Sequence, residues 1–284
     1  MKKVSVILTT YNSQKFIEKT INSINKQIGI GSDFDLELIV VDDCSTDKTT
    51  EILERYNIAY LSTKTNSGGP NKGRNIGLKA SSGDYICIAD HDDEWNDNRV
   101  LKLLPHLEQA PIVTSGYTLI DKNSDSKIVR VNQSEKAFSY YDKNITFKKT
   151  LTRSLERQNT YLGSIIYRSE LKNILFEEYY GVIDYDWILR LFYQNSSIEV
   201  NASLYTRFVG GNNLSLNEDY RIKDLRYSLE SIDQYKEKHP SEYRISYKKI
   251  HGSMGRYYYL MGNMKKARFY FLKSEFNIKT IMYY

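Results

Sequence analysis

Three aspartates gather within four residues at Asp90-His91-Asp92-Asp93, directly after an apolar run at residues 85–89. Carboxylates two positions apart on an extended segment suit a hard cation such as Mg²⁺ or Mn²⁺, which takes oxygen ligands and shares them with substrate phosphates. His91 stands among oxygen donors, so we do not expect it to be a ligand. The cluster predicts a divalent-cation site on Asp92 and Asp90, with a solvated acidic turn as an equally good alternative when the cluster is taken alone.

Two further polar segments carry residue types that bind nucleotides. Asp42 and Asp43 end an apolar run at residues 36–41, where a carboxylate can accept from a base N–H or hold a ribose hydroxyl; capping of the next helix is the alternative. Arg74 follows the glycine-rich segment 66–73, whose glycines let backbone amides approach a ligand. Arginine pairs well with a phosphate or a base edge. The segment is not a Walker loop, because no Gly-Lys-Ser/Thr completes it.

The order of apolar runs and helical patterns shows which elements must position these side chains. Strand and helix alternate through the first hundred residues, which predicts an α/β fold with a mostly parallel sheet flanked by helices. Ligands bind beyond the carboxyl ends of the strands in such sheets. Because polar residues follow three of the strands, we expect these ends to converge on one crevice. The expected strands are residues 4–8, 36–41, 58–61 and 85–89, the expected helices 16–24, 52–56 and 75–80, and the polar ends 9–12, 42–45 and 90–93.

The pattern is less regular after residue 100. Residues 112–117 and 161–168 predict strands, and residues 183–192 predict a helix that begins on acidic side chains. Residues 121–160 are polar and are expected to form loops. From residue 217 the pattern is helical to the end. We also expect Asn12 or Ser13 to cap the first helix.

The net charge of +5 is unevenly distributed along the 284 residues. Residues 221–284 hold 14 Lys or Arg against 6 Asp or Glu, together with ten tyrosines, whereas the preceding part is mildly acidic. Three interpretations of this helical tail stay open: packing on the rest of the chain, a homo-oligomer interface, where tyrosine is favoured, and contact with an anionic membrane. A nucleic-acid partner is not expected, because no segment repeats like a recognition module.

The hydropathy and the cysteine content of the chain fit a cytoplasmic setting, which is the location we expect. No stretch reaches the roughly 18–20 apolar residues of a membrane-spanning helix, and the apolar run after Met1 is too short for a signal peptide. Cys44 and Cys87 provide neither a disulfide framework nor a zinc site. If the basic tail binds lipid, the protein would be peripheral at the inner face of the membrane.

Four linked motifs in the first hundred residues resemble the family 2 glycosyltransferases. The resemblance is specific, because the order and the spacing of the motifs match throughout. It implies a GT-A fold, a nucleotide-diphospho-sugar donor such as a UDP-sugar, a divalent cation (Mn²⁺ or Mg²⁺), and inversion at the anomeric carbon. The motifs lie within residues 4–12, 40–47, 66–77 and 83–93.

The resemblance also implies roles for individual residues. Asp90 and Asp92 would form the Asp-x-Asp motif, with Asp92 nearest the metal, and Asp93 would lie near the donor sugar or the acceptor. The residues around the nucleotide base and ribose would be Thr9, Tyr11, Asp42 and Arg74.

An inverting transfer needs a base that takes the proton of the acceptor hydroxyl. The family usually supplies it from a Glu-Asp pair at a helix start; here the aspartate is Asp184, and Ile183 replaces the glutamate. Asp186 is the alternative. Side chains two residues apart on a helix diverge by about 200°, so only one of the two can face the hydroxyl, and we favour Asp184. Trp187 is expected either to stack on a sugar or to lie in the core.

Arg207 lies in a segment where many relatives have an arginine, then a histidine, then a loop of small residues. The histidine position holds Val209 here. We expect Arg207 to contact the diphosphate when residues 210–215 close as a lid over the donor. A plain surface loop is the alternative.

Together these features predict an inverting, metal-dependent hexosyltransferase. The GT-A-like catalytic domain is expected at residues 1–216, with a nucleotide-binding half at 1–95 and an acceptor-binding half at 96–216, followed by a basic, Tyr-rich helical region at 217–284. The expected acceptor is a glycan or a lipid-linked glycan, and a composition rich in Lys, Asn, Ile and Tyr points to bacterial surface polysaccharide synthesis. The alternatives are a sugar-phosphate nucleotidyltransferase and a non-catalytic partner subunit, which Ile183 and Val209 would fit.

Overall fold

The computed structural model describes residues 1–210 and 218–275, within a chain that divides into two compact units. The first unit comprises Met1–Thr146 and Gln158–Gly211, and the second comprises Phe147–Arg157 and Asn212–Tyr284. This division differs from the single expected boundary at residue 216, because the short segment 147–157 groups with the C-terminal helices.

The first unit is built on a sheet whose first four strands are all parallel. Its strand order is β3-β2-β1-β4-β9-β6-β10-β5, with β7 paired to β6 and β8 paired to β10. Antiparallel partners in the second half make the sheet as a whole mixed. The strands are β1 Lys2–Thr10, β2 Phe34–Asp42, β3 Tyr60–Ser62, β4 Tyr85–Asp90, β5 Glu94–Trp95, β6 Ile112–Asp121, β7 Ser126–Arg130, β8 Phe138–Tyr141, β9 Ile166–Arg168 and β10 Ser197–Val209.

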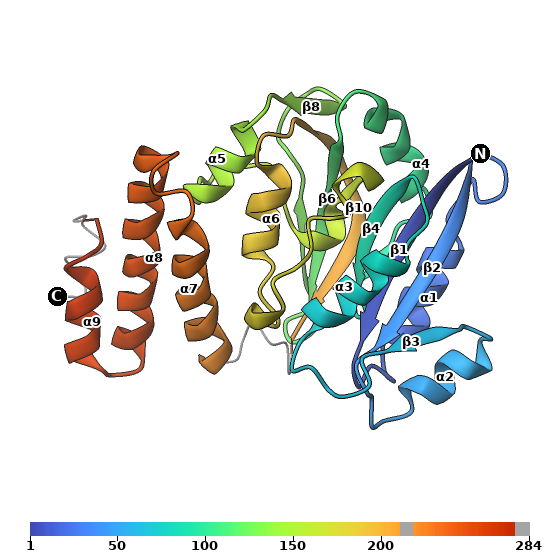
Figure 1. The fold of residues 1–284 in the computed structure, drawn as a ribbon, viewed down its shortest axis with the longest axis horizontal. Coiled ribbons are helices and arrows are strands. Elements are labelled where there is room, and N and C mark those ends of the chain that lie inside the picture. The colour runs from blue at the N-terminus through green and yellow to red at the C-terminus, as the bar shows by residue number, and fades with distance from the viewer. Residues whose placement is uncertain (211–217, 276–284) are drawn as a thin grey trace. The chain divides into compact units, whose positions relative to one another are not determined.

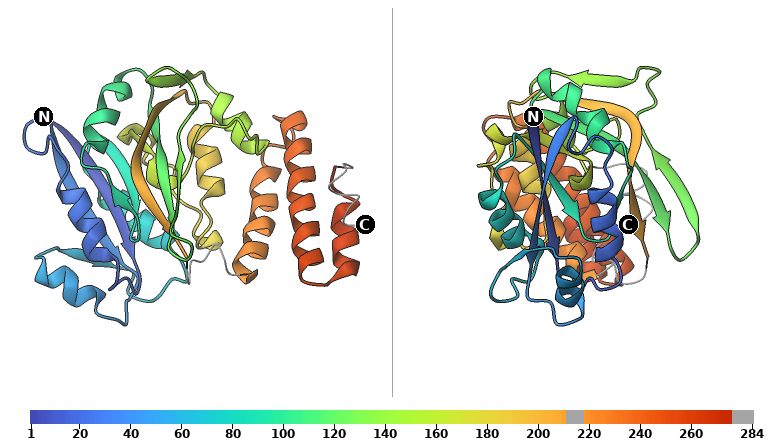
Figure 2. Two further views of the ribbon diagram at one scale, coloured as in Figure 1. Left: turned by 180° about the vertical axis from the view of Figure 1, so that it is seen from behind. Right: turned by 90° about the vertical axis from the view of Figure 1, so that its right-hand side faces the viewer.

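Helices cover both faces of this sheet. The helices α3 and α6 lie on the face turned to the viewer in Figure 1, and α1 lies behind it, as the reverse view in Figure 2 shows. The α/β architecture expected from the alternating pattern is therefore confirmed. The helices of the first unit are α1 Ile17–Asn25, α2 Thr49–Arg55, α3 Pro70–Ala80, α4 Arg99–Leu103 and α6 Tyr185–Phe192, whereas most of α5 Ile145–Leu151 belongs to the second unit.

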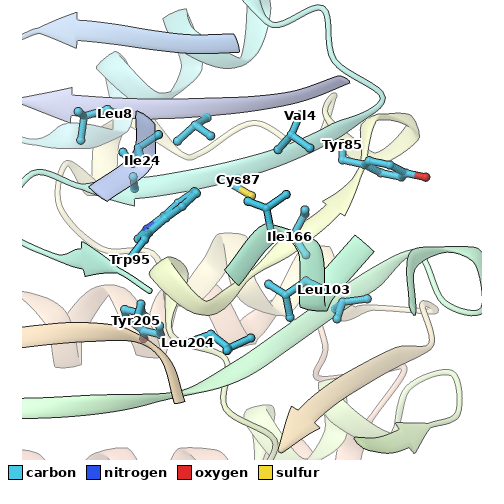
Figure 3. Packing of buried hydrophobic residues seen from close by; sticks show 14 of the residues in the cluster. Val4, Leu8, Ile24, Tyr85, Cys87, Trp95, Leu103, Ile166, Leu204 and Tyr205 are labelled. Carbon is cyan, nitrogen blue, oxygen red and sulfur yellow. The ribbon is translucent and has the colours of Figure 1, made fainter. Parts of the chain in front are cut away.

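Alternate side chains of β1 point to the two opposite faces of the sheet. Val4 and Leu8 belong to the buried cluster that also contains Ile24 of α1, Cys87 of β4 and Trp95 of β5 (Figure 3). Because side chains alternate along a strand, Ile7 and Thr9 point to the opposite face, toward α3.

Two glycines let α3 lie very close to β1. A Cβ atom added at Gly77 would be 2.4 Å from Cγ2 of Ile7, and one added at Gly73 would be 3.0 Å from Cγ2 of Thr9. Only glycine tolerates the first of these approaches without displacement of the strand. The close packing holds Arg74, which lies between the two glycines, at the carboxyl end of the sheet.

Several sequence-based expectations were wrong in detail. The segment 121–160 is not a set of loops but contains β7, β8 and α5. Every residue of β7 is exposed, so its sequence lacks the alternating burial that identifies a strand. The expected strand at 161–168 is a 3₁₀ turn at Leu162–Ser164 followed by the short β9.

Helix starts also differ from expectation. Helix α3 begins at Pro70, inside the segment 66–73 that was expected to be a loop, because proline suits the first helical turn. Neither Asn12 nor Ser13 caps α1 through its side chain. Phe16 holds the N-cap position, and the backbone carbonyl of Ser13 accepts from the N–H groups of Phe16 and Ile17.

The second unit is helical, as the sequence predicted, with α7 Glu218–Asp233, α8 Pro240–Leu260 and α9 Met264–Phe271. The helices α8 and α9 form a hairpin, in which the rings of Tyr258 and Tyr270 stack 5.3 Å apart. The side chain of Asn263 caps α9 by accepting from the N–H of Lys266 at 3.1 Å. Within the described ranges, no helix is both long enough and apolar enough to cross a membrane.

Candidate active site

The register of the parallel strands brings the expected polar strand ends together. Thr9 pairs with Asp90 across β1 and β4, and Thr10 pairs with Asp42 across β1 and β2. Thr9 and Asp42 are buried, whereas Tyr11, just beyond the end of β1, is 44% exposed. A ligand at this edge would therefore meet residues from three strands.

Arg74 is the buried cation of this edge. Its Nη2 donates to Oδ1 of Asp90 at 2.9 Å, and its Nη1 donates to Oδ1 of Asn71 at 3.2 Å. The guanidinium also lies 5.2 Å from the ring centroid of Phe176. Its Nε–H has no hydrogen-bond partner in the described structure. Arg74 is thus fixed in place and retains a donor.

The first turn of α3 also holds the segment that leads into α6. The side-chain amide of Asn71 donates to the carbonyl oxygen of Ile183 at 3.1 Å, and its backbone N–H donates to the carbonyl of Gly181 at 3.0 Å. Asn75 donates to the carbonyl of Phe176 at 2.9 Å and accepts from its N–H at 2.8 Å. A hydrogen-bonded path therefore runs from Asp90 through Arg74 and Asn71 to the residue before Asp184.

The two candidate bases at the start of α6 have different surroundings. Asp184 occupies the N-cap position and is partly exposed. Asp186 is buried and accepts from Nε and Nη2 of Arg190, at 2.8 and 2.6 Å. Trp187 is 1% exposed and stacks on Phe176 at 4.5 Å, so its sugar-stacking interpretation was wrong and its core interpretation is confirmed.

The carboxylates at the end of β2 order the loops around them. Ser45 donates to Asp42 from its N–H at 2.9 Å and from its hydroxyl at 2.5 Å. Asp43 accepts from the hydroxyl of Thr63 at 2.5 Å and from the N–H of Ser67 at 3.0 Å. Since a carboxylate has about four lone-pair positions, Asp42 retains acceptor capacity for a ribose hydroxyl.

Burial and mutual repulsion disfavour the charged forms of the carboxylates in the acidic cluster. Burial raises the pKa of Asp93 well above its usual value, and the charges of Asp90 and Asp92 raise it further, while Arg207 partly offsets the rise. Burial also raises the pKa of Asp92. The hydroxyl of Thr20 fixes the turn by donating to the carbonyl of Asp93 at 2.9 Å. A cation bound here would relieve the repulsion between the carboxylates.

The acidic cluster would have to share a divalent cation with a ligand, because it offers few oxygen donors of its own. Among residues 1–210 and 218–275, no group of three or more His, Cys, Asp or Glu is arranged to hold a metal ion. Asp90 already pairs with Arg74, so Asp92 is the main oxygen donor available. Mg²⁺ is commonly bound by one or two carboxylates plus phosphate oxygens and water, and this arrangement matches that pattern.

Arg207 lies on β10 beside three tyrosines. Its guanidinium carbon is 4.3 Å from the ring centroid of Tyr161 and 5.8 Å from that of Tyr117. The rings of Tyr117 and Tyr205 are 5.6 Å apart. Tyr161 is 45% exposed and presents an aromatic surface near Asp93 and Arg207. The expected lid at residues 210–215 lies outside the described residues, except for Gly210.

Sequence reasoning missed residues that position the site rather than line it. Asn71 and Asn75 form hydrogen bonds with residues more than 100 positions away in the sequence, so no local pattern could predict their partners. Their spacing of four residues on one helix face was the available signal. Tyr161 was read only as part of a strand, and its aromatic character was the signal for a ligand surface.

Comparison with known proteins identifies the family. The profile described as "Glycosyl transferase family 2" matches residues 5–174. The chain belongs to glycosyltransferase family 2. The family membership decides against the sugar-phosphate nucleotidyltransferase alternative.

Similar proteins within and around this family differ in how much of the chain they match. The poly(ribitol-phosphate) beta-N-acetylglucosaminyltransferase TarS of Staphylococcus aureus is 46% identical over 100 residues, which are 34% of this chain and 17% of that protein. The GalNAc(5)-diNAcBac-PP-undecaprenol beta-1,3-glucosyltransferase of Campylobacter jejuni is 28% identical over 89% of each chain. The amylovoran biosynthesis glycosyltransferase AmsB of Erwinia amylovora is 27% identical over 96% of this chain and 95% of its own.

A solved structure shares the fold of this family 2 glycosyltransferase. The crystal structure of residues 1–349 of Staphylococcus aureus TarS in complex with UDP-GlcNAc has a TM-score of 0.65 and 20% identity. The match covers 95% of this chain and 90% of that chain. The GT-A-like fold expected from the motifs is therefore confirmed.

Proposed function

We propose that this family 2 glycosyltransferase moves a sugar from a UDP-sugar to a hydroxyl group of a glycan or lipid-linked glycan, with inversion, in bacterial surface polysaccharide synthesis. The observation that carries the proposal is the path from Asp90 through Arg74 and Asn71 to Ile183, which connects the donor edge of the sheet to Asp184. The UDP-GlcNAc complex of the S. aureus structure supports a UDP-sugar donor. The names of two relatives include phosphate-bearing acceptors, poly(ribitol-phosphate) and a PP-undecaprenol glycan.

The chemistry requires a base on the acceptor side and a stabilised leaving group. In the proposed step, the acceptor oxygen bonds to the anomeric carbon, its proton passes to the carboxylate of Asp184, and the bond from that carbon to the diphosphate breaks to release UDP. Arg74 holds the nucleotide, and Arg207 lies where it can contact the diphosphate or the sugar. Asp184 is favoured as the base because it is partly exposed, whereas Asp186 is buried and forms a salt bridge with Arg190.

A divalent cation, Mn²⁺ or Mg²⁺, is part of this proposal. Asp92 would hold it, with Asp90 beside it, and its charge would stabilise the departing diphosphate. The repulsion of Asp93 by the charges of Asp90 and Asp92 supports this assignment, because a cation between these carboxylates would relieve it. Thr9, Tyr11 and Asp42 are assigned to the base and ribose, and Asp93 to the sugar or acceptor.

The location and assembly of the protein are also proposals. We place it in the cytoplasm, at the inner face of the membrane if the second unit contacts lipid. That unit exposes Leu260, Phe269 and Leu272 among basic residues, which supports either a homo-oligomer or a peripheral contact. Light scattering of the pure protein and its flotation with anionic vesicles separate the two.

Calorimetry with UDP and Mn²⁺, followed by a release assay with a panel of UDP-sugars, tests the proposed function. We expect UDP to bind only with the cation, and at least one UDP-sugar to release UDP when an acceptor is supplied. If neither UDP nor any UDP-sugar binds, the non-catalytic partner subunit becomes the better interpretation.

A further inference from the structure

A small cavity lies against Asp92 on the α1 side of the sheet. Its volume is about 110 Å³, and its wall includes the side chains of Lys15, Lys19 and Lys122. The rings of Phe16 and Phe208 complete one side of it. We call this cavity the lysine pocket; the nucleotide-binding roles assigned above do not involve any of its lysines.

Aromatic rings hold one of the three ammonium groups in place. The Nζ atom of Lys122 lies 4.5 Å from the ring centroid of Phe16 and 4.6 Å from that of Phe208. The backbone N–H of Lys122 donates to the carbonyl of Val209 at 2.8 Å, which joins the turn after β6 to the end of β10. A cation between two rings is attracted by both of them, so the charge stays at the cavity.

The positive charge of the pocket is not cancelled by ion pairs. Lys15, Lys19 and Lys122 form no salt bridge with any carboxylate in the described ranges. Two carboxylates, Asp92 and Glu94, also line the pocket, so it carries three positive charges against two negative ones. A cation on Asp92 would increase the positive excess further. The net charge of the pocket therefore suits an anion even without a bound cation.

The lysine pocket and the tyrosine-lined side of the active site lie on opposite faces of β10. Consecutive strand residues point to opposite faces. Accordingly, Arg207 lies over Tyr161, whereas Phe208 lies against Lys122. Arg74 contacts Asp90 on the α3 side of the sheet, away from α1. The pocket thus adjoins Asp92 but is separate from the arginines assigned to the donor.

We propose that the lysine pocket binds a phosphate group of the acceptor, so that the enzyme acts on phosphate-bearing glycan acceptors. This proposal rests on the proposed transferase function. Ligand pockets for whole small molecules have volumes of roughly 300–1,000 Å³, and water occupies about 30 Å³ per molecule. A cavity of about 110 Å³ accordingly fits one tetrahedral anion and not a sugar ring. Lysine binds phosphate as a point charge without demanding a fixed geometry.

The test compares two triple variants of the full chain that lose the same charge. Lys15→Gln/Lys19→Gln/Lys122→Gln empties the pocket of positive charge. Lys26→Gln/Lys79→Gln/Lys127→Gln removes three exposed lysines elsewhere in the same unit. Calorimetry measures the binding of inorganic phosphate without divalent cation, and separately the binding of UDP with Mn²⁺.

We expect the pocket variant to lose phosphate affinity by at least about tenfold, since each charge-assisted hydrogen bond is worth about that factor. Its affinity for UDP should stay within about twofold of the wild type, and the control variant should keep both affinities. Thermal unfolding checks that each variant is folded. If the triple variant does not fold, Lys122→Gln alone replaces it, with an expected loss of about tenfold.

Three results would overturn the proposal. Equal phosphate binding by the pocket variant and the wild type would mean that the pocket is not an anion site. Equal losses of phosphate affinity in the pocket and control variants would mean that phosphate responds to the overall surface charge and not to the pocket. A parallel loss of UDP affinity would assign the pocket to the donor diphosphate. By contrast, a wild type that binds phosphate but no UDP would contradict the transferase proposal and not the pocket.

Discussion

Arg190 and Asp186 form a salt bridge one turn apart on α6, with 2.6 Å between Nη2 of the arginine and Oδ2 of the aspartate. The arginine also donates to the carbonyl of Leu175 at 2.8 Å, so the pair attaches α6 to the segment before it. This contact gives Asp186 a structural role, and the proposed base is the neighbouring Asp184.

The first prediction contrasts these aspartates. Asp184→Asn should lower kcat by about 10²–10⁴-fold, the usual contribution of a general base, and leave UDP affinity unchanged. Asp186→Asn should instead lower the free energy of unfolding by about 1–3 kcal/mol, because Arg190 loses its charged partner. Single-turnover kinetics and urea unfolding of both variants measure this. If Asp186→Asn is the inactive, stable variant, the base has been assigned to the wrong residue.

The second prediction concerns the cation. Asp92→Asn should weaken Mn²⁺-dependent UDP binding by at least about tenfold, since a charged ligand of the metal is replaced by a neutral one. Chelation of divalent cations from the wild type should have the same effect. Asp97→Asn, at an exposed position five residues further along, serves as the control and should bind UDP normally. UDP binding that does not depend on the cation would refute the metal assignment.

The third prediction uses the close approach of two backbones. A Cβ at Gly69 would lie 2.6 Å from the carbonyl carbon of Gly181, so Gly69→Ala must displace the segment that leads to Asp184. We expect a fall in kcat of about tenfold or more and a loss of about 1–3 kcal/mol in stability, as for other overpacked sites.

Gly68 provides the matched control for this prediction. A Cβ there meets nothing within 4 Å, but its φ of +76° strains any residue with a side chain. Gly68→Ala should therefore cost about 1–2 kcal/mol of stability and leave kcat nearly unchanged. Equal losses of kcat in the two variants would show that the clash with Gly181 is not the cause.

The fourth prediction is a dependence of stability on pH. Glu37 accepts from the hydroxyl of Ser5 and from the N–H of Ser82 at 2.9 Å. Burial alone would raise the pKa of Glu37, but these hydrogen bonds outweigh it and the pKa is lowered. A lowered pKa means that the stabilisation is present above the unfolded value of about 4.3 and is lost as the pH falls through the folded value.

Glu37→Gln should accordingly be less stable than the wild type at pH 7, by about 1–2 kcal/mol, and the difference should shrink as the pH falls below about 4. Urea unfolding of both proteins across this range gives the difference. Glu54→Gln, at an exposed position of α2, should show no such trend. A difference that stays constant with pH would mean that the charge of Glu37 is not responsible.

The first half of the fold was predictable because its central strands, β1 and β4, are buried on both faces. Such strands appear as continuous apolar runs, and parallel pairing then requires their carboxyl ends to meet at one edge. The pairing of Thr9 with Asp90 follows from this rule without knowledge of any side-chain contact. The family motifs added the chemistry that the pattern alone left open.

The second half was harder to predict for physical reasons. Strand β7 is exposed throughout, so no burial pattern marks it. The contacts of Asn71 with Ile183 and of Asn75 with Phe176 join residues more than 100 positions apart, and an asparagine gives no sign of which carbonyl it will meet. Trp187 was ambiguous for another reason: an aromatic residue beside a candidate base could bind a sugar or fill the core, and the structure buries it in the core.

Strand β10 pairs with β6 through two interruptions of its register, between Val200 and Ser203 and between Ser203 and Thr206. A shift of one residue along a strand exchanges its two faces, which here would send Arg207 toward α1 and Phe208 toward the tyrosines. The irregular stretch between these points is where extra or missing residues can be absorbed. Natural variants of this chain that differ in length should therefore carry their insertions or deletions within residues 201–205. The side chains of the last residues of β10 should still point to the same faces of the sheet.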